Sequence, residues 1–179
     1  YEGIKPNDPM FQQIYKLADE HKLIVMLHPD DNLRDGIEEI LKGFPNVIFF
    51  FHGGRPQEWI VDLMPKYKNF YYSIDADINH IYGFKSEHQY QKLKSKEEYL
   101  SYMRSNFDSV LEEEVAHWKA RVEKYPDRFT WGSDRWFAWH YDPEVGGIVE
   151  EFSRSFIGRL DPAVQENLAY KNAQKMLEQ

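Results

Sequence analysis

The sequence has 179 residues, a net charge of −8 and no cysteine. This length suits one domain, and a content of 42% hydrophobic residues is enough for a sizeable core. The acidic balance offers no basic face to nucleic acid, no apolar run approaches the ~20 residues that span a bilayer, and the lack of cysteine excludes disulfides and thiolate metal sites.

The first half of the chain alternates helix signals with short apolar runs. Asp8 followed by Pro9 is typical of a helix start, since Asp caps and Pro suits the first helical position. The apolar runs are too short for helices and too uniformly apolar for half-exposed strands, which indicates strands buried on both faces. The expected order is a strand tail over 1–5, helices near 9–22, 33–43 and 56–66, and strands over 23–28, 47–52 and 70–75.

The second half begins with a polar and aromatic stretch from 76 to 94. Ser95 with Glu98 forms a capping box, and the apolar spacing after it predicts a long helix, single or broken, to about 124. We interpret 76–124 as an insertion before a fourth strand over 129–134. A helix near 143–158 and a last helix after Asp161-Pro162 complete the chain, which we interpret as one domain over 1–179.

The alternation predicts an α/β fold with a parallel sheet and right-handed crossovers. Polar residues at the strand ends recur at 23, 24 and 23 residues, at Lys5, His28, His52 and Asp75. Such a period is typical of a (β/α)8 TIM barrel, which needs ~250 residues, so this sequence predicts roughly half a barrel. A half-barrel exposes sheet edges and apolar strand faces, and we therefore expect either a homo-oligomer or an incomplete chain.

Two histidines and an aspartate end three of the expected strands: His28, His52 and Asp134. Taken alone, each is more simply a structural residue at a strand end. Together they face one rim of a parallel sheet, where imidazole and carboxylate can converge on a metal or move protons. Without cysteine the suitable metal is Zn²⁺, with Mn²⁺ or Fe²⁺ as alternatives.

The chain resembles the amidohydrolase superfamily, in its amidohydrolase-related branch of metal-dependent hydrolases. The resemblance spans the whole chain as barrel strands four to eight and rests on these segments: Gly3-Ile4-Lys5, Leu27-His28-Pro29, His52-Gly53-Gly54, the run from Thr130 to Asp134, and QENLAYKNA over 165–173. It implies that His28 binds the metal, that His52 carries a proton, and that Asp134 binds the metal and shuttles a proton. Lys5 holds the place of a metal-bridging lysine in binuclear relatives, although an ordinary lysine is the better interpretation there.

The function implied by the resemblance is hydrolysis of an ester, lactone or amide in a small-molecule substrate. Three alternatives stay open: non-oxidative decarboxylation within the same branch, a metal-free lactonase that relies on Asp134, and a non-catalytic half-barrel. The family's His-x-His pair of the first strand does not occur in this sequence. The predicted metal site therefore has two firm ligands in this chain.

Three further residues are candidates for binding substrate at the same rim. Asp75 ends the third strand, with loop capping as an equally good interpretation. Arg55 and Arg135 each lie close to a predicted site residue and could clamp a carboxylate, although surface ion pairing is the simpler alternative. The aromatic residues from Trp131 to Tyr141 could form a flat apolar wall. The compartment is open: we expect a cytoplasmic location, or a periplasmic one if an upstream signal is removed.

Overall fold

Four parallel strands form one sheet in the order of the sequence. The computed structural model describes residues 5–28, 33–52, 58–75, 95–135 and 137–178. The strands are β1 (Ile24–Leu27), β2 (Ile48–Phe51), β3 (Phe70–Ile74) and β4 (Phe129–Trp131). This confirms the predicted α/β class and the parallel sheet, and each strand is shorter than its predicted range by one to three residues.

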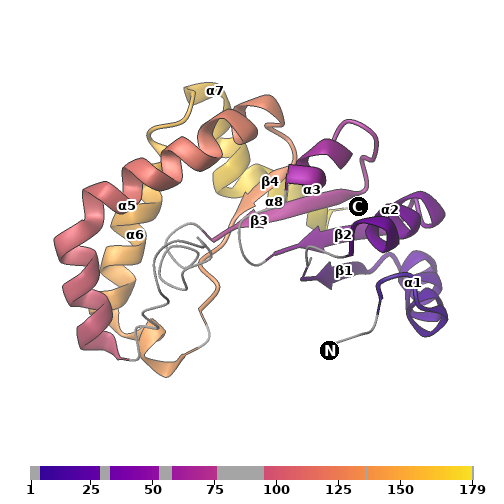
Figure 1. The fold of residues 1–179 in the computed structure, drawn as a ribbon, viewed down its shortest axis with the longest axis horizontal. Coiled ribbons are helices and arrows are strands. Elements are labelled where there is room, and N and C mark those ends of the chain that lie inside the picture. Colours follow the sequence, from indigo (N-terminus) through magenta and orange to yellow (C-terminus); the bar gives the residue numbers. More distant parts are fainter. Residues whose placement is uncertain (1–4, 29–32, 53–57, 76–94, 136, 179) are drawn as a thin grey trace.

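The register of the sheet is fixed by parallel hydrogen bonding. Leu27 pairs with Phe51, Phe51 pairs with Tyr72, and Ile74 pairs with Trp131. Because every strand runs in the same direction, all four carboxyl ends lie at one edge of the sheet (Figure 1). Residues that follow the strands directly are therefore brought to that edge.

Helices pack on one side of the sheet and extend beyond it. The helical elements are α1 (Pro9–His21), α2 (Arg34–Gly43), α3 (Glu58–Leu63), α5 (Lys96–Lys124), η2 (Ala138–Tyr141), α6 (Pro143–Ile157), α7 (Pro162–Glu166), the π-helical turn η3 (Asn167–Lys171) and α8 (Asn172–Leu177). The long α5 and α6 lie side by side and project away from the strands, whereas α1 and α2 lie at the β1 end of the sheet (Figure 1).

Local sequence explains where the main helices start. The Asp8 side chain accepts a hydrogen bond from the backbone of Met10, with Pro9 at the first helical position. The Ser95 side chain accepts from the backbone N–H of Glu98 at 3.3 Å, as its capping box predicts. The structure resolves the open alternative for the segment that follows, because α5 is one continuous helix of 29 residues.

The helix-facing side of the sheet is an aromatic core. Tyr72 and Phe129 pack against Trp118 of α5, and Phe49 packs edge-on against Tyr15 of α1. All five side chains are essentially inaccessible to water. Burial of such large apolar surfaces provides the main stabilisation of the fold, at about 25 cal/mol per Å².

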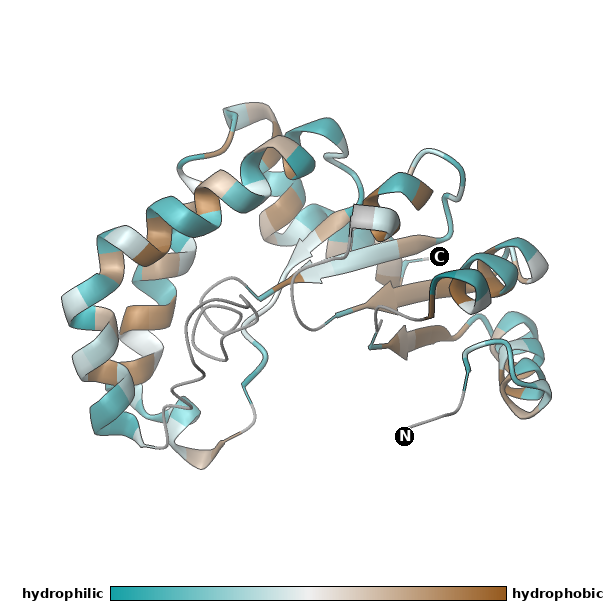
Figure 2. Cartoon of the chain, in the orientation of Figure 1, coloured by the Kyte–Doolittle hydropathy of each residue, from teal (hydrophilic) through white to brown (hydrophobic). Residues whose placement is uncertain are grey.

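The opposite side of the sheet is less fully covered at β1. Met26, on this face of β1, is 60% exposed. Colouring by hydropathy shows the apolar character of β1 and β2 (Figure 2). An apolar side chain on this face of β1 is therefore left uncovered within the described structure, as expected for an incomplete barrel.

Two predictions from the sequence concern the ends of the chain. The predicted strand tail over 1–5 falls outside the described residues except for Lys5, which is exposed and not in a strand. The last helix is interrupted by the π-helical turn η3, which apolar spacing alone did not predict. Within the described part of the chain, no helix combines the length and the apolar character that a bilayer crossing requires.

The buried side chain of Asn172 joins the C-terminal helices to β4. Its Nδ2 group donates to the backbone oxygens of Pro126 at 2.9 Å and Phe129 at 2.8 Å. These two bonds satisfy carbonyl groups at the start of the strand. Asn172 thus connects the last helix to β4, the strand that precedes Asp134.

We expect Asn172→Ala to lower the free energy of unfolding by about 1–3 kcal/mol, because it leaves two carbonyl acceptors without their donor. Urea denaturation followed by circular dichroism measures this change. Gln174→Ala is the matched control, since that side chain bonds only to exposed Glu178 in the described structure, and we expect it to change stability by less than about 0.5 kcal/mol. Equal stabilities of the two variants would contradict a stabilising role of the two Asn172 hydrogen bonds.

Candidate functional site

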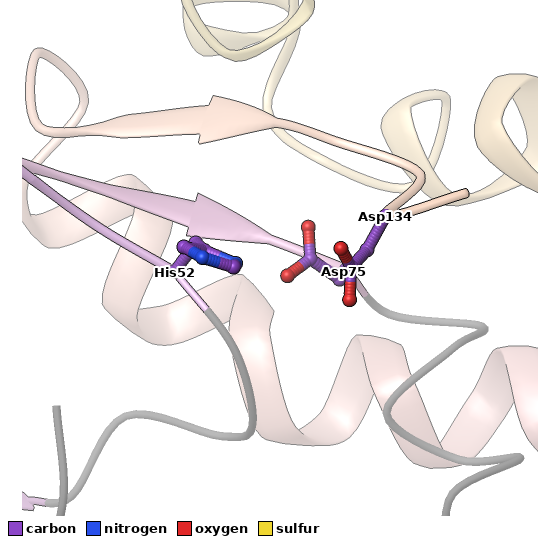
Figure 3. Close-up of side chains that lie close together, drawn as sticks. All are labelled: His52, Asp75 and Asp134. Carbon is purple, nitrogen blue, oxygen red and sulfur yellow. The ribbon is translucent and has the colours of Figure 1, made fainter. Parts of the chain in front are cut away.

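The candidate site lies at the carboxyl edge of the sheet, where α/β proteins place their chemistry. His52 follows β2 directly, Asp75 follows β3 directly, and Asp134 lies three residues beyond β4. The three side chains converge in one place (Figure 3). Each offers a ligand atom, and these atoms lie within 4.8 Å of one another.

His28 lies beside His52 but outside that group of three. The two rings meet edge to face, with 5.4 Å between their centroids. The backbone N–H of His52 donates to the carbonyl of Leu27 at 3.2 Å, which extends the strand pairing by one residue and holds the two histidines side by side. The neighbourhood inferred from successive strands is therefore present. The role of His28 as a metal ligand stays a prediction.

Asp75 is the most deeply buried member of the site, with 2% of its surface exposed. The Ser73 hydroxyl, two residues earlier on the same face of β3, donates to Asp75 Oδ1 at 3.1 Å. Across from Asp75, the backbone N–H of Gly132 donates to the carbonyl of Ile74 at 3.0 Å. Any side chain at position 132 would collide with this pair. A Cβ on Gly132 would lie 2.7 Å from Asp75 Oδ1 and 2.5 Å from Ser73 Oγ.

Asp134 is the exposed carboxylate of the site and has an unusual backbone conformation. Its φ angle is +40°, one of two positive values among non-glycine residues in the described chain. Aspartate tolerates the left-handed region better than most residues, yet such a conformation is retained only where the surrounding structure imposes it. The turn brings the carboxylate back toward His52 and Asp75 (Figure 3).

The segment after Asp134 builds an aromatic wall near the site. Buried His140 packs against the rings of Trp139 and Phe137, with centroid distances of 4.1 and 5.3 Å. Burial lowers the pKa of His140, the positive charge of Arg135 acts in the same direction, and the negative charge of Asp134 opposes both. His140 is therefore close enough to both residues to sense their charges.

The predicted substrate-binding residues have different positions. Asp75 lies within the group of three, as described above. Arg135 is half-buried, and its guanidinium nitrogens lie 3.8 Å from the position that a Cβ on Gly146 of α6 would occupy. Arg55 lies outside the described residues, as does Trp136 of the aromatic stretch. Substrate contacts by these residues remain predictions.

Two residues that shape the site, Ser73 and Gly132, were not predicted from the sequence. The available signal was periodicity: Ser73 precedes Asp75 by two residues, so alternation along a strand places both on one face. Gly132 lies two residues before Asp134, and a glycine inside a strand pattern often marks a close backbone approach. The identity of the group it approaches depends on the register between β3 and β4, which the sequence does not contain.

The donor set fits a divalent metal. Two carboxylates and an imidazole within 4.8 Å offer the oxygen and nitrogen ligands that zinc, manganese and iron accept. Without a cation, two carboxylates this close to each other repel, and one of them is buried. A cation at this position would offset that repulsion, so the chemistry of the side chains supports a metal-binding group.

Comparison with known proteins gave two matches. A family model described as "Amidohydrolase" matches residues 1–179. The solved structure of an uncharacterized TIM-barrel protein from Bordetella bronchiseptica is similar, with a TM-score of 0.57 and 17% sequence identity. The match covers 98% of this chain and 52% of that chain, and the chain thus spans about half the length of that barrel. A search of the curated proteins found no match.

The structural likeness identifies the four-stranded sheet as part of a (β/α)8 barrel. In this fold the carboxyl ends of the strands form the rim at which active sites lie. His52, Asp75 and Asp134 occupy that rim in the described structure. The predicted half-barrel architecture is therefore confirmed, and the position of the candidate site agrees with it.

We expect Gly132→Ala to destabilise the protein by about 1–3 kcal/mol, because the new methyl group must displace Ser73 and Asp75. Thermal unfolding measures the effect. Gly147→Ala in α6 is the matched control: nothing lies within 4 Å of its added Cβ, and alanine in a helix should stabilise by about 0.5–1 kcal/mol. Opposite signs of the two shifts are expected, and a neutral Gly132→Ala variant would refute the close approach.

Proposed function

This chain belongs to the amidohydrolase family, and on that premise we propose that it carries the metal-binding and proton-transfer half of a metal-dependent hydrolase. The observation that carries the proposal is the convergence of His52, Asp75 and Asp134, with His28 against His52. The family match suggests a hydrolase or a related activity. Hydrolysis of a small ester, lactone or amide is the finer step that we propose here.

In this proposal His28 and Asp134 would hold a divalent metal, Zn²⁺ being the first candidate. When bound, such a metal supplies Lewis-acid chemistry, since it polarises a carbonyl and lowers the pKa of water toward ~7. The exposed carboxylate of Asp134 would accept a proton at the rim. Its location at the open rim, rather than beneath it, supports this role.

His52 acts as the proton carrier in the same proposal. Its half-buried ring meets the ring of His28 edge to face, and one of its nitrogens lies within 4.8 Å of carboxylate oxygens of Asp75 and Asp134. These groups can take up or release a proton. An imidazole at this position can donate a proton to the leaving group. The arrangement thus provides both an acceptor and a donor for the two proton transfers of hydrolysis.

The substrate is proposed to be a small molecule with a planar apolar part. Trp139 is half-buried and stacks nearly parallel to Phe137, with 6.0 Å between the ring centroids and 11° between the planes. Such rings can line an apolar pocket. Arg135 is the described cation nearest to Asp134 in the sequence, and it is proposed to contact an acidic group of the substrate.

We expect Asp134→Asn to reduce the turnover of the full-length protein on a panel of aryl esters and lactones by about 10²–10⁴-fold. Asparagine also tolerates a positive φ, so this change removes the charge with little backbone penalty. Asp108→Asn on the exposed surface of α5 is the control and should retain full turnover. Undiminished hydrolysis by Asp134→Asn would refute the assigned role.

Removal of metal separates this proposal from a metal-free lactonase. Dialysis against a strong chelator should abolish hydrolysis by the wild-type protein, and stoichiometric Zn²⁺ should restore it. The measurement is the rate of ester or lactone hydrolysis before and after addition of zinc. A rate that survives exhaustive chelation, with no residual metal by elemental analysis, would favour the metal-free alternative.

A further inference from the structure

Asp75 is a buried carboxylate whose surroundings fix its orientation. Its exposed fraction is 2%, whereas Asp134 beside it is exposed. Burying a carboxylate is unfavourable unless hydrogen bonds or a cation compensate for the lost water. Burial raises the pKa of Tyr72, and the negative charge of Asp75 acts in the same direction. The Asp75 carboxylate therefore needs neighbouring groups that compensate for its burial.

Ser73 supplies one fixed contact, to a single carboxylate oxygen. The hydroxyl donates to Oδ1 at 3.1 Å, and both residues are buried on the same face of the same strand. A hydroxyl held this way orients the carboxylate plane. Gly132 makes room for this pair, since any Cβ there would overlap with both oxygen atoms.

A second buried hydroxyl lies on the same side of the sheet. Thr130 pairs in register with Ser73 across β3 and β4, so its side chain lies beside that of Ser73. Thr130 is 3% exposed, and its Oγ1 atom has no hydrogen-bond partner within the described part of the chain. Ser73 and Thr130 thus make the surroundings of Asp75 on this face polar. Polar surroundings suit an ion-binding site better than a purely apolar core does.

We propose that Asp75 is itself a ligand of the metal at this centre, and that Ser73 is the residue that positions it, with Gly132 providing the space. This inference rests on the proposed metal-dependent function and adds a ligand to it. The proposal replaces the interpretation of Asp75 as a substrate contact. It also explains how two carboxylates whose ligand atoms lie within 4.8 Å can both be present at this rim.

The balance of charge supports this assignment. Two carboxylates without a cation would carry two negative charges at close range, one of them buried. A divalent cation held by Asp75 and Asp134 would neutralise both charges, beside the imidazole of His52. Hydrogen bonds to ligating carboxylates orient them, and loss of such a bond typically weakens metal binding by about 10–100-fold. Ser73 is placed to make this contribution.

The test is the zinc affinity of the metal-depleted, full-length protein, measured by competition with a chromophoric chelator. Ser73→Ala should weaken zinc binding by about 10–100-fold, and Ser73→Thr, which keeps the hydroxyl, should restore affinity to near the wild-type value. Asp75→Asn should weaken binding more than Ser73→Ala, because it removes the charged ligand while keeping an acceptor for Ser73. Ser109→Ala, on the exposed surface of α5, is the control and should bind as the wild type does.

Thermal unfolding without metal separates positioning from general stability. A positioning role predicts that Ser73→Ala unfolds near the wild-type temperature when metal-free and gains less from added zinc. Unchanged zinc affinity in both Ser73→Ala and Asp75→Asn would overturn the inference. So would weak binding by Ser73→Thr equal to that of Ser73→Ala.

Affinity and turnover distinguish the two proposals. If the wild-type protein binds zinc through Asp75 but hydrolyses no ester or lactone, the hydrolase proposal fails and the ligand assignment stands. If the protein hydrolyses its substrate with zinc while the Asp75 and Ser73 variants bind the metal normally, the ligand assignment fails and the hydrolase proposal stands.

Discussion

The hydrogen-bond register of the parallel sheet is the constraint on which the candidate site depends. Two backbone bonds continue the strand pairing past the last formal strand residues, from His52 to Leu27 and from Gly132 to Ile74. These bonds place His28 beside His52 and Asp75 beside Gly132. The side chains of the rim therefore take their positions from the main chain, and a slip of one residue would turn each of them to the opposite face.

The aromatic core makes that register costly to change. Phe49, Phe51, Tyr72 and Phe129 alternate along the strands with residues of the opposite face and are buried on the helix side. A shifted strand would expose these rings and bury polar groups such as Ser73. The same alternation thus stabilises the fold on one face of the sheet and presents the histidine and carboxylates on the other, which links packing directly to the proposed chemistry.

Much of this arrangement could be predicted from the sequence, because it depends on local pattern. Short apolar runs predicted the four strands, the Ser95 capping box predicted the start of α5, and the spacing of His28 and His52 predicted neighbouring strand ends. The grouping of Asp75 with His52 and Asp134 could not be derived this way. It depends on the stagger between β2, β3 and β4, on the space left by Gly132, and on the positive φ of Asp134, all of which arise from tertiary packing.

The central claim is that a divalent metal binds at the rim between these side chains. An anomalous difference map from crystals of the full-length protein grown with zinc, recorded at the zinc absorption edge, tests it most directly. The account predicts a single strong peak at about 2.0–2.2 Å from ligand atoms that include Asp134 and Asp75, close to His28 and His52. A fully occupied zinc site elsewhere, with no peak at this rim, would contradict the account.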